Sequence, residues 1–551
     1  MARKILQLFH KSFHNINQAA LILALFTLLV QLTGLIRDRL LAGHIGPGPI
    51  LDLYNAAFPI PDLIFALGAS VVSVTILMPF LAESMREEND MAKTRHFLNT
   101  IFTTFFGGMI LVSIVIGILM PWLVKFVAPG FSPEMLHELI LLSRIMLLSP
   151  ILLGLSNLVG TITQLHKKFF VFAMSPVLYN VGIIIGILFL YPIMGVKGLI
   201  IGVIIGALLH FLMQIPVIIM QKLVPRFVWR IDWRLVWHVI SISIPRTFTL
   251  SCNQIAILIF YALASKMSSG SISIFKFALT LQLVPISIIG TSYAVAAFPN
   301  LVEYFTTGKH EQFLDSIIMP ARRIIFWSIP ITVLFIVLRA QIVRVILGVG
   351  QFSWSDTRLV AASMGILVIG VTAQSMINLV VRAYYAAGRT WRPLLMNAGG
   401  VIFEIILALT FIKIYKISPG IRDWFDHIMR VSNVEGAEVI LIVLAFMLGT
   451  VFNYLILWYA FKREFLRERR VLISTTIWQS IIASLGIGAI AYVMLQLLDN
   501  IFNINTFWGV FAQGFIAGII AICFGILILI LMKNEEILSL LNRFFKKKET
   551  L

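Results

Sequence analysis

Long apolar runs dominate this sequence, and they limit most strongly how the chain can fold. Runs of roughly 20 or more apolar residues, enough to cross a bilayer as a helix, can be placed about fourteen times. Because 59% of the 551 residues are hydrophobic and only 12% are charged, a soluble protein could not cover this apolar surface. We therefore predict an all-α polytopic membrane protein with about 14 transmembrane helices. The predicted spans are 17–42, 52–83, 97–128, 137–165, 169–193, 198–221, 235–265, 271–304, 318–347, 357–387, 391–415, 436–461, 471–497 and 504–532.

The basic residues predict the direction of these spans. The net charge is +18, but Lys and Arg cluster in short connections between apolar runs, which argues against a nucleic-acid partner and for cytoplasmic loops. Even-numbered connections such as "QKLVPRFVWR" and "KREFLRERR" are basic, whereas the odd-numbered "APGFSPEM" has no Lys or Arg. We predict that both termini are cytoplasmic. The external loop 416–435 disagrees, because Lys416, Arg422 and Arg430 lie in it and Lys413 just before it.

Sequence similarity at an offset near 220 residues predicts two homologous halves. "LVKFVAPGFS" (Leu123 to Ser132) returns as "IVRVILGVGQFS" (Ile342 to Ser353), "MPFLAE" (Met78 to Glu83) as "FPNLVE" (Phe298 to Glu303), and "SNLV" as "INLV". Six spans separate the copies, so both halves start with the same orientation, and such parallel repeats commonly enclose a ligand site near mid-membrane.

The repeat predicts the following organisation, in chain order. An N-terminus at the cytoplasmic interface (1–16) precedes an N-lobe of six spans (17–221), a cytoplasmic linker (222–234) and a C-lobe of six spans (235–461). A basic loop (462–470), a further pair of spans with a candidate lipid-tail groove (471–532) and a basic tail (533–551) follow.

Four stretches that begin at Thr33, Met78, Ile244 and Arg382 together resemble the MurJ (MviN) family of lipid II flippases, within the multidrug/oligosaccharidyl-lipid/polysaccharide exporter superfamily. "TGLIRDRLLAGHIGPGPILDLYNAAFPIPDLI" (Thr33 to Ile64) resembles the family pattern G-x-x-R-D…G-x-G…D-x-x-x-x-A-F-x-x-P-N-L, and "MPFLAE" resembles V-P-x-L-A-E. "IPRTFTLSCNQI" is similar to the seventh-span segment, and "RAYYAAGRTWRP" to R-x-F-Y-A-x-x-D-T-x-T-P. The chain departs from the pattern where Gln31, Phe65 and Thr280 fall at or near family arginines, so it looks like a divergent member.

The resemblance implies export of an undecaprenyl-pyrophosphate-linked peptidoglycan precursor across the bacterial cytoplasmic membrane by alternating access. The implied partners are this lipid-linked oligosaccharide, membrane lipids and cell-wall synthesis proteins. Three alternatives stay open: a flippase of another lipid-linked oligosaccharide, a small-molecule or cation antiporter, and a non-transporting scaffold for wall synthesis. The antiporter would need an acidic cavity, whereas the departures from the family arginines leave the scaffold open.

Cations inside the spans are the candidate contacts for a pyrophosphate. Arg37 is the first candidate, because guanidinium binds phosphate oxygens bidentately and stays charged, and Asp38 would orient it. A structural ion pair, or interfacial snorkelling by the adjacent Arg39, is the alternative interpretation. Arg246, after Pro245 in span seven, and Lys276 in span eight are further candidates for the cavity, with anchoring at the interface as their alternative.

Acidic residues suggest two further roles. Glu83 and Glu303 occupy equivalent repeat positions and, with Arg382, are candidates for a gate, although helix-end salt bridges would explain them too. Glu404, a lone acid deep in span eleven, could bind a coupling cation or proton with Asn397 or Asn253, or be a hydrogen-bonded structural residue. Transport would then draw on an ion gradient or the membrane potential.

The sequence has no pattern typical of an enzyme. It lacks GxxxxGK[ST], its histidines are scattered, and no connection is long enough for a catalytic domain. Its two cysteines lie in apolar runs and predict neither a disulfide nor a metal site. We therefore predict a transporter with no catalytic residue, no metal site and no cofactor.

Overall fold

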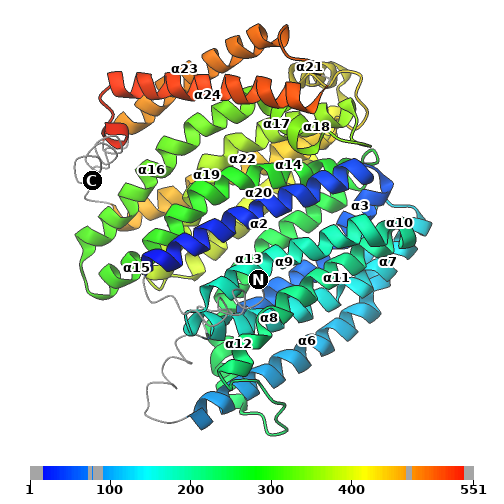
Figure 1. Cartoon of the computed structure of the whole chain (residues 1–551), viewed down its shortest axis with the longest axis vertical. Coiled ribbons are helices and arrows are strands. Elements are labelled where there is room, and N and C mark those ends of the chain that lie inside the picture. The colour runs from blue at the N-terminus through cyan, green and yellow to red at the C-terminus, as the bar shows by residue number, and fades with distance from the viewer. Residues whose placement is uncertain (1–15, 72–76, 78–90, 467–473, 505, 539–551) are drawn as a thin grey trace, which may run out of the picture. The chain divides into compact units, whose positions relative to one another are not determined.

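The structure is a computed structural model that describes residues 16–71, 77, 91–466, 474–504 and 506–538 (Figure 1). Every regular element in these ranges is a helix, which confirms the all-α prediction. Helices satisfy their backbone hydrogen bonds internally, as a segment inside hydrocarbon must.

The number of spans also agrees with the sequence. Within the described residues, twelve helical segments are long and apolar enough to cross a membrane, and each coincides with a predicted span. The two other predicted spans coincide with α2 (Ile16–His44) and α13 (Trp233–Ala264), which have 29 and 32 residues. At a rise of about 1.5 Å per residue, both exceed the roughly 30 Å of a hydrocarbon core.

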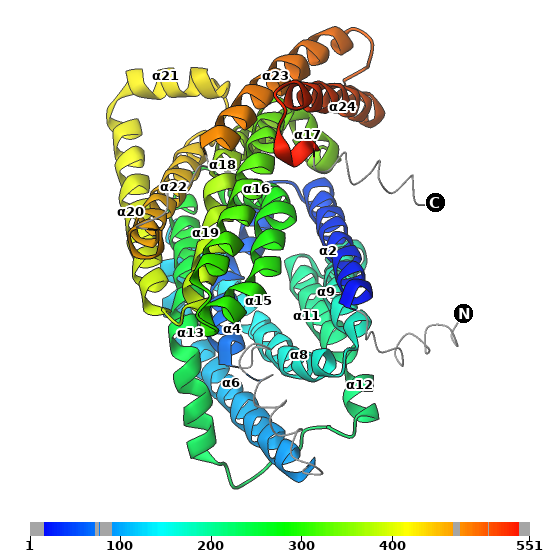
Figure 2. The same cartoon turned by 90° about the vertical axis from the view of Figure 1, so that its left-hand side faces the viewer.

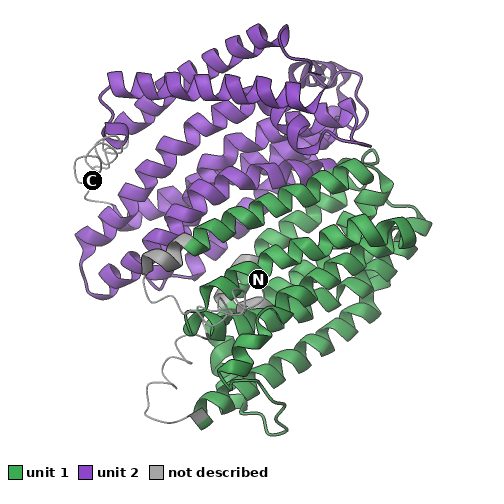
Figure 3. Ribbon diagram, viewed as in Figure 1, with its two compact units in different colours: residues 1–273 green, residues 274–551 purple. Residues whose placement is uncertain are grey.

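The chain divides into two compact units, residues 1–273 and 274–551 (Figure 3). The first unit includes α13, which the sequence analysis placed in the C-lobe; α13 packs against α4 and α6. The lobe boundary at 222–234 stays a prediction. The helices of the first unit are α2, α3 (Pro49–Ala56), α4 (Pro59–Val71), α6 (Met91–Val127), α7 (Pro133–Met146), α8 (Leu148–Leu165), α9 (Phe169–Ile185), the π-helix η1 (Gly186–Leu190), α10 (Tyr191–Met194), α11 (Val196–Leu212), α12 (Ile215–Met220) and α13.

The second unit continues from α14, whose first three residues still belong to the first unit. In this unit α23 packs against both α24 and α16, and α24 also contacts α17. A lipid-tail groove at α23 and α24 stays a prediction. The helices are α14 (Ser271–Pro285), the π-helix η2 (Ile286–Thr291), α15 (Ser292–Thr306), α16 (His310–Val337), α17 (Arg339–Leu347), α18 (Trp354–Leu367), the 3₁₀-helix η3 (Val368–Gly370), α19 (Val371–Ala386), α20 (Trp391–Ile417), α21 (Pro419–Met429), α22 (Val439–Phe465), α23 (Ser474–Asp499) and α24 (Phe507–Leu531).

The predicted repeat is visible in how two helices begin. In "APGFS" Ser132 caps α7, its hydroxyl accepting a hydrogen bond from the Met135 N–H, and in "VGQFS" Ser353 caps α18 in the same way from Asp356. A serine at this position satisfies an N–H that the helix itself leaves unpaired. The two copies of the motif therefore perform the same structural task. The other copy of "FPNLVE", which ends at Glu83, lies outside the described residues.

Glycines bring α9 and α11 into unusually close contact. Gly198, Gly202 and Gly206 recur every fourth residue on α11. Gly206 faces Gly182 of α9, Gly202 faces Gly186 at the start of η1, and Gly198 faces the Leu190 backbone at the end of η1. A Cβ placed on Gly202 would lie 2.5 Å from the Gly186 Cα, closer than real Cβ atoms come to a neighbouring atom. Small residues at this spacing let helix backbones approach closely in membranes, where packing replaces the hydrophobic effect.

We predict that Gly202→Ala lowers stability by about 1–3 kcal/mol, because the added methyl group forces two backbones apart. The matched control is Gly107→Ala on α6, where an added Cβ meets nothing within 4 Å. Thermal unfolding of both purified variants in the same detergent is the measurement. Equal melting temperatures for Gly202→Ala and Gly107→Ala would contradict the close packing of α9 on α11.

Candidate functional site

Arg37 and Asp38, the central candidates, form an ion pair on α2. The Arg37 Nε donates to Asp38 Oδ1 at 2.8 Å, and its Nη2 lies 2.8 Å from the same oxygen. The Asp38 side chain is almost fully buried, whereas that of Arg37 keeps 21% of its surface exposed. The adjacent positions let one carboxylate neutralise the guanidinium without a second helix.

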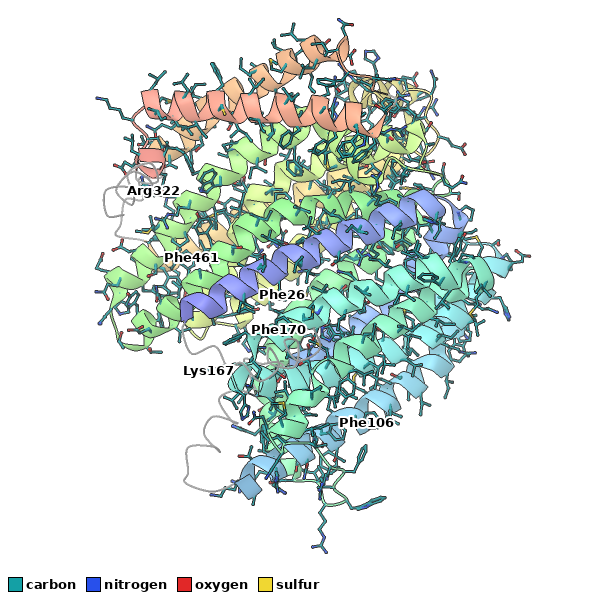
Figure 4. All side chains as sticks on the ribbon, viewed as in Figure 1. Phe26, Phe106, Lys167, Phe170, Arg322 and Phe461 are labelled. Carbon is teal, nitrogen blue, oxygen red and sulfur yellow. The ribbon has the colours of Figure 1, made fainter. Side chains whose placement is uncertain are left out.

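Asn180 of α9 completes the surroundings of Arg37. Its Oδ1 accepts a hydrogen bond from Arg37 Nη1 at 3.0 Å, and its Nδ2 donates to the Thr33 hydroxyl and to the Val30 carbonyl. The same two helices also meet at Phe26 and Phe170, whose rings pack edge to face with centroids 5.4 Å apart (Figure 4). Asn180 was missed at the sequence level, although a lone Asn in an apolar run was an available signal.

This arrangement bears on both interpretations of Arg37. Three nitrogen contacts fix the guanidinium, as expected for a structural ion pair. The exposed fifth of its side chain still leaves Arg37 accessible, and a phosphate oxygen could compete with the neutral Asn180 carbonyl for Nη1. The pyrophosphate contact therefore stays a prediction.

The other two cavity candidates are placed less completely. Arg246 lies in the course of α13, but its side chain is outside the part that the structure describes. Lys276 is exposed on α14. Arg246 is in the first unit and Lys276 in the second, and the cavity role of both stays a prediction.

Asp52 of α3 is a buried acid that the sequence analysis did not single out. Its carboxylate accepts hydrogen bonds from the Gly270 N–H at 2.7 Å, the Ser273 N–H at 2.8 Å and the Ser273 hydroxyl at 2.6 Å. It therefore caps the first turn of α14 from another helix. Asn55 donates to the same Ser273 hydroxyl. The sequence feature that could have identified Asp52 is its position in "ILDLYNAAF", where it matches the D of the family pattern.

The structure describes two of the three residues that the sequence suggested for a gate. Glu83 lies outside the described residues, Glu303 is exposed near the end of α15, and Arg382 is partly buried on α19. The gate stays a prediction.

Glu464 of α22 is an acid, not predicted from the sequence, that forms ion pairs with two arginines. Glu464 is only 11% exposed, pairs with Arg389 and Arg392, and accepts a hydrogen bond from the Tyr384 hydroxyl. Sequence reasoning missed Glu464 because its three partners lie about 70 to 80 positions earlier in the chain.

Glu404 is buried between α20 and α22 in the second unit. It is 6% exposed, shares a hydrogen bond with Thr450, and packs on Gly449, where any Cβ would collide with its Cγ. Asn397, one of the predicted partners, lies on the same helix and accepts a hydrogen bond from Asn453 Nδ2 at 3.0 Å. Asn253 is exposed on α13 in the first unit, so its part in such a site stays a prediction.

Two properties limit what these groups can hold. Among the described residues, no three His, Cys, Asp or Glu side chains gather in a way that could hold a metal ion. At Glu404 the recorded oxygens are instead its own carboxylate and the Thr450 hydroxyl, and a lone buried carboxylate suits a proton or a monovalent cation. Asn397 and Asn453 form a separate hydrogen-bonded pair further along the same two helices. Oδ1 of Asn453 is buried there with no hydrogen-bond partner among the described groups.

Comparison with known sequences gives a consistent result. Residues 41–515 match the sequence profile of the family described as "Lipid II flippase MurJ". A probable lipid II flippase MurJ of Rickettsia prowazekii is 25% identical over 418 residues, covering 74% of this chain and 82% of the relative. The lipid II flippase MurJ of Burkholderia cenocepacia is 24% identical over 408 residues, covering 73% and 79%.

Comparison with solved structures confirms the fold. A lipid II flippase MurJ in an inward closed conformation matches with a TM-score of 0.73 at 21% identity, covering 95% of this chain and all of that one. A multidrug resistance MATE family transporter of the MOP superfamily matches at a TM-score of 0.62 and 15% identity, covering 80% and 96%.

We predict that Asp38→Asn destabilises the protein by about 3 kcal/mol, because it leaves the partly buried Arg37 guanidinium without its counter-charge. The double variant Arg37→Gln/Asp38→Asn removes both charges and should be less destabilised than Asp38→Asn alone. Thermal unfolding of the two single variants and the double variant measures this coupling. Additive losses would show that the two side chains do not depend on one another.

Proposed function

Because the chain belongs to the lipid II flippase MurJ family, we propose that it moves lipid II from the inner to the outer leaflet by alternating access. The observation that carries this proposal is the family match over residues 41–515, which covers most of the chain. The apolar helices agree with it, since they are long enough to cross a membrane several times, and family membership makes this the inner membrane. The proposal makes the protein a transporter that catalyses no covalent step.

The physical problem is to move a pyrophosphate through hydrocarbon, where an unpaired charge costs at least several kcal/mol. Arg37 supplies a cation in the second half of α2, and Asp38 already neutralises its charge. Arg37 therefore needs no other counter-ion while no substrate is bound. On substrate binding, the lipid-linked pyrophosphate would approach the exposed part of the Arg37 side chain and replace Asn180 at the Arg37 Nη1. The Arg37 guanidinium would then exchange its hydrogen bond to Asn180 for one to a phosphate oxygen.

The proposed direction of transport rests on the family, and the predicted topology supplies the orientation of the protein in the membrane. The basic even-numbered connections support cytoplasmic termini under the positive-inside rule. Lipid II synthesis enzymes on the inner side and wall-synthesis proteins on the outer side are then the partners that the transport direction requires. The MATE neighbour shares the fold at 15% identity, which does not favour an antiporter of drugs or cations.

An energy source is the remaining part of the proposal, and Glu404 is its candidate. Glu404 lies buried beside Thr450. Asn453 follows three residues after Thr450 on α22, packs against Gly400, and keeps a side-chain carbonyl oxygen free of described partners. A proton or monovalent cation bound there would neutralise a carboxylate that is costly to bury charged. Binding and release of that ion would couple a gradient to rearrangement of α20 against α22.

In cells, we predict that depleting the protein lowers lipid II in the outer leaflet and raises it in the inner leaflet. Labelling lipid II on each side of the membrane is the measurement. Unchanged lipid II in the outer leaflet on depletion would reject the flippase proposal. Arg37→Ala should fail to restore the distribution, whereas the neighbouring Arg39→Ala, read as an interfacial anchor, should restore it. Full rescue by Arg37→Ala would remove that residue from the transport path.

For the coupling site, we predict that Glu404→Gln abolishes the dependence of flipping on an imposed proton or sodium gradient. Gln keeps the size of the side chain but cannot ionise, so it neither takes up and releases a proton nor offers a cation a negative charge. The control is Glu435→Gln, an exposed acid in the connection before α22. Flipping assays in vesicles with each gradient set separately provide the readout. Gradient dependence that survives in Glu404→Gln would exclude this carboxylate.

A further inference from the structure

Helix α21 occupies the connection between α20 and α22 and does not continue either of them. Ser418 is extended where α20 ends, and Pro419 begins α21, so the chain changes direction between the two residues. Figure 2 shows α21 running across the end of α20 rather than along it. The helix ends at Arg430, which adopts the left-handed conformation with φ of 57°.

Contacts in the second half of α21 and directly after it fix this helix to the second unit. The Tyr415 hydroxyl lies 3.0 Å from both carboxylate oxygens of Asp426, and the Tyr415 ring packs edge to face on Phe425. Burial raises the pKa of Asp426, an effect that this hydrogen bond opposes. Directly after the helix, the Arg358 guanidinium of α18 donates to the Arg430 carbonyl. A loosely tethered loop would not need these contacts.

The side chains of α21 divide among three faces. Phe425 is buried against the protein. Asp423 and His427, four residues apart, form an exposed polar face. Ile421, Trp424 and Ile428, spaced by three and four residues, form one exposed apolar stripe on which Trp424 is 64% exposed. We call these three residues the α21 stripe.

The α21 stripe continues the lipid-facing surface of α20. Ile406, Leu409, Ile414 and Ile417 are large apolar residues exposed along the second half of that span, and Ile417 precedes α21 directly. Lys413 and Lys416 are exposed at the same end of α20, where long cationic side chains usually reach the headgroups. The membrane surface therefore lies at the level at which α21 begins.

We propose that α21 lies in the plane of the membrane interface, with the α21 stripe inserted at the boundary between phospholipid headgroups and acyl chains. Tryptophan and isoleucine on one face with charges on the others are typical of an interfacial helix. This position accounts for Lys413, Lys416, Arg422 and Arg430, the basic residues that conflict with the positive-inside rule. They are interfacial anchors of α20 and α21, and they fix the depth of this helix pair in the bilayer. The proposal does not depend on the identity of the substrate.

Depth measurements in liposomes test this directly. The chain has only two cysteines, Cys252 and Cys523, so replacing both with serine gives a background for single labels. Single cysteines at Ile421, Trp424 and Ile428 are compared with matched controls at Asp423 and His427 on the same helix. Each variant carries a nitroxide and is reconstituted in liposomes of phosphatidylethanolamine and phosphatidylglycerol. Collision rates with oxygen and with a water-soluble nickel chelate are then measured.

We expect oxygen collisions to exceed nickel-chelate collisions several-fold on the α21 stripe, with the reverse order at Asp423 and His427. Equal ratios at all five positions would overturn the proposal. So would a stripe that reacts freely with a membrane-impermeant maleimide in these liposomes but is protected in native membranes, because a protein partner would then cover it. Maleimide labelling of the same five cysteine positions also works in cell membranes without purification. It therefore tests the proposal even if a variant is unstable in detergent.

Discussion

A charge inside hydrocarbon must find its partners within the protein, and this constraint organises the polar interior of the chain. The described charged residues that are most buried include Asp38, Asp52 and Glu404. Asp38 pairs with Arg37, Asp52 accepts three hydrogen bonds at the start of α14, and Glu404 shares one with Thr450. Each is joined to a neighbouring side chain or helix end, as expected where water cannot supply a partner.

Small residues make these polar contacts geometrically possible. Gly449 leaves room for the Glu404 side chain against α22, and Gly270 has φ of +92° where its N–H reaches Asp52. The glycines of α9 and α11 serve packing in the same way. In a membrane protein, close backbone approach and satisfied polar groups are thus linked, because the approach brings donors and acceptors within reach.

The fold was largely predictable, because apolar length and loop charge are local properties of the sequence. The predicted spans coincide with helices, and the repeat correctly paired the serine caps Ser132 and Ser353. The site was less predictable. Asn180 lies 143 positions after Arg37, and Ser273 lies 221 positions after Asp52, so only the fold reveals these partners. The four lysines and arginines around α21 were read as a conflict in topology, because a sequence does not show that a loop contains an interfacial helix.

The central claim is that this chain alone carries lipid II across a bilayer. The most direct measurement reconstitutes the purified protein in liposomes that contain labelled lipid II and follows how fast lipid II from the inner leaflet becomes accessible to an external reagent. The account predicts transfer well above that of protein-free liposomes, and loss of that transfer in Arg37→Ala. Transfer by the intact protein no faster than in empty liposomes, with the protein folded and an ion gradient imposed, would contradict it.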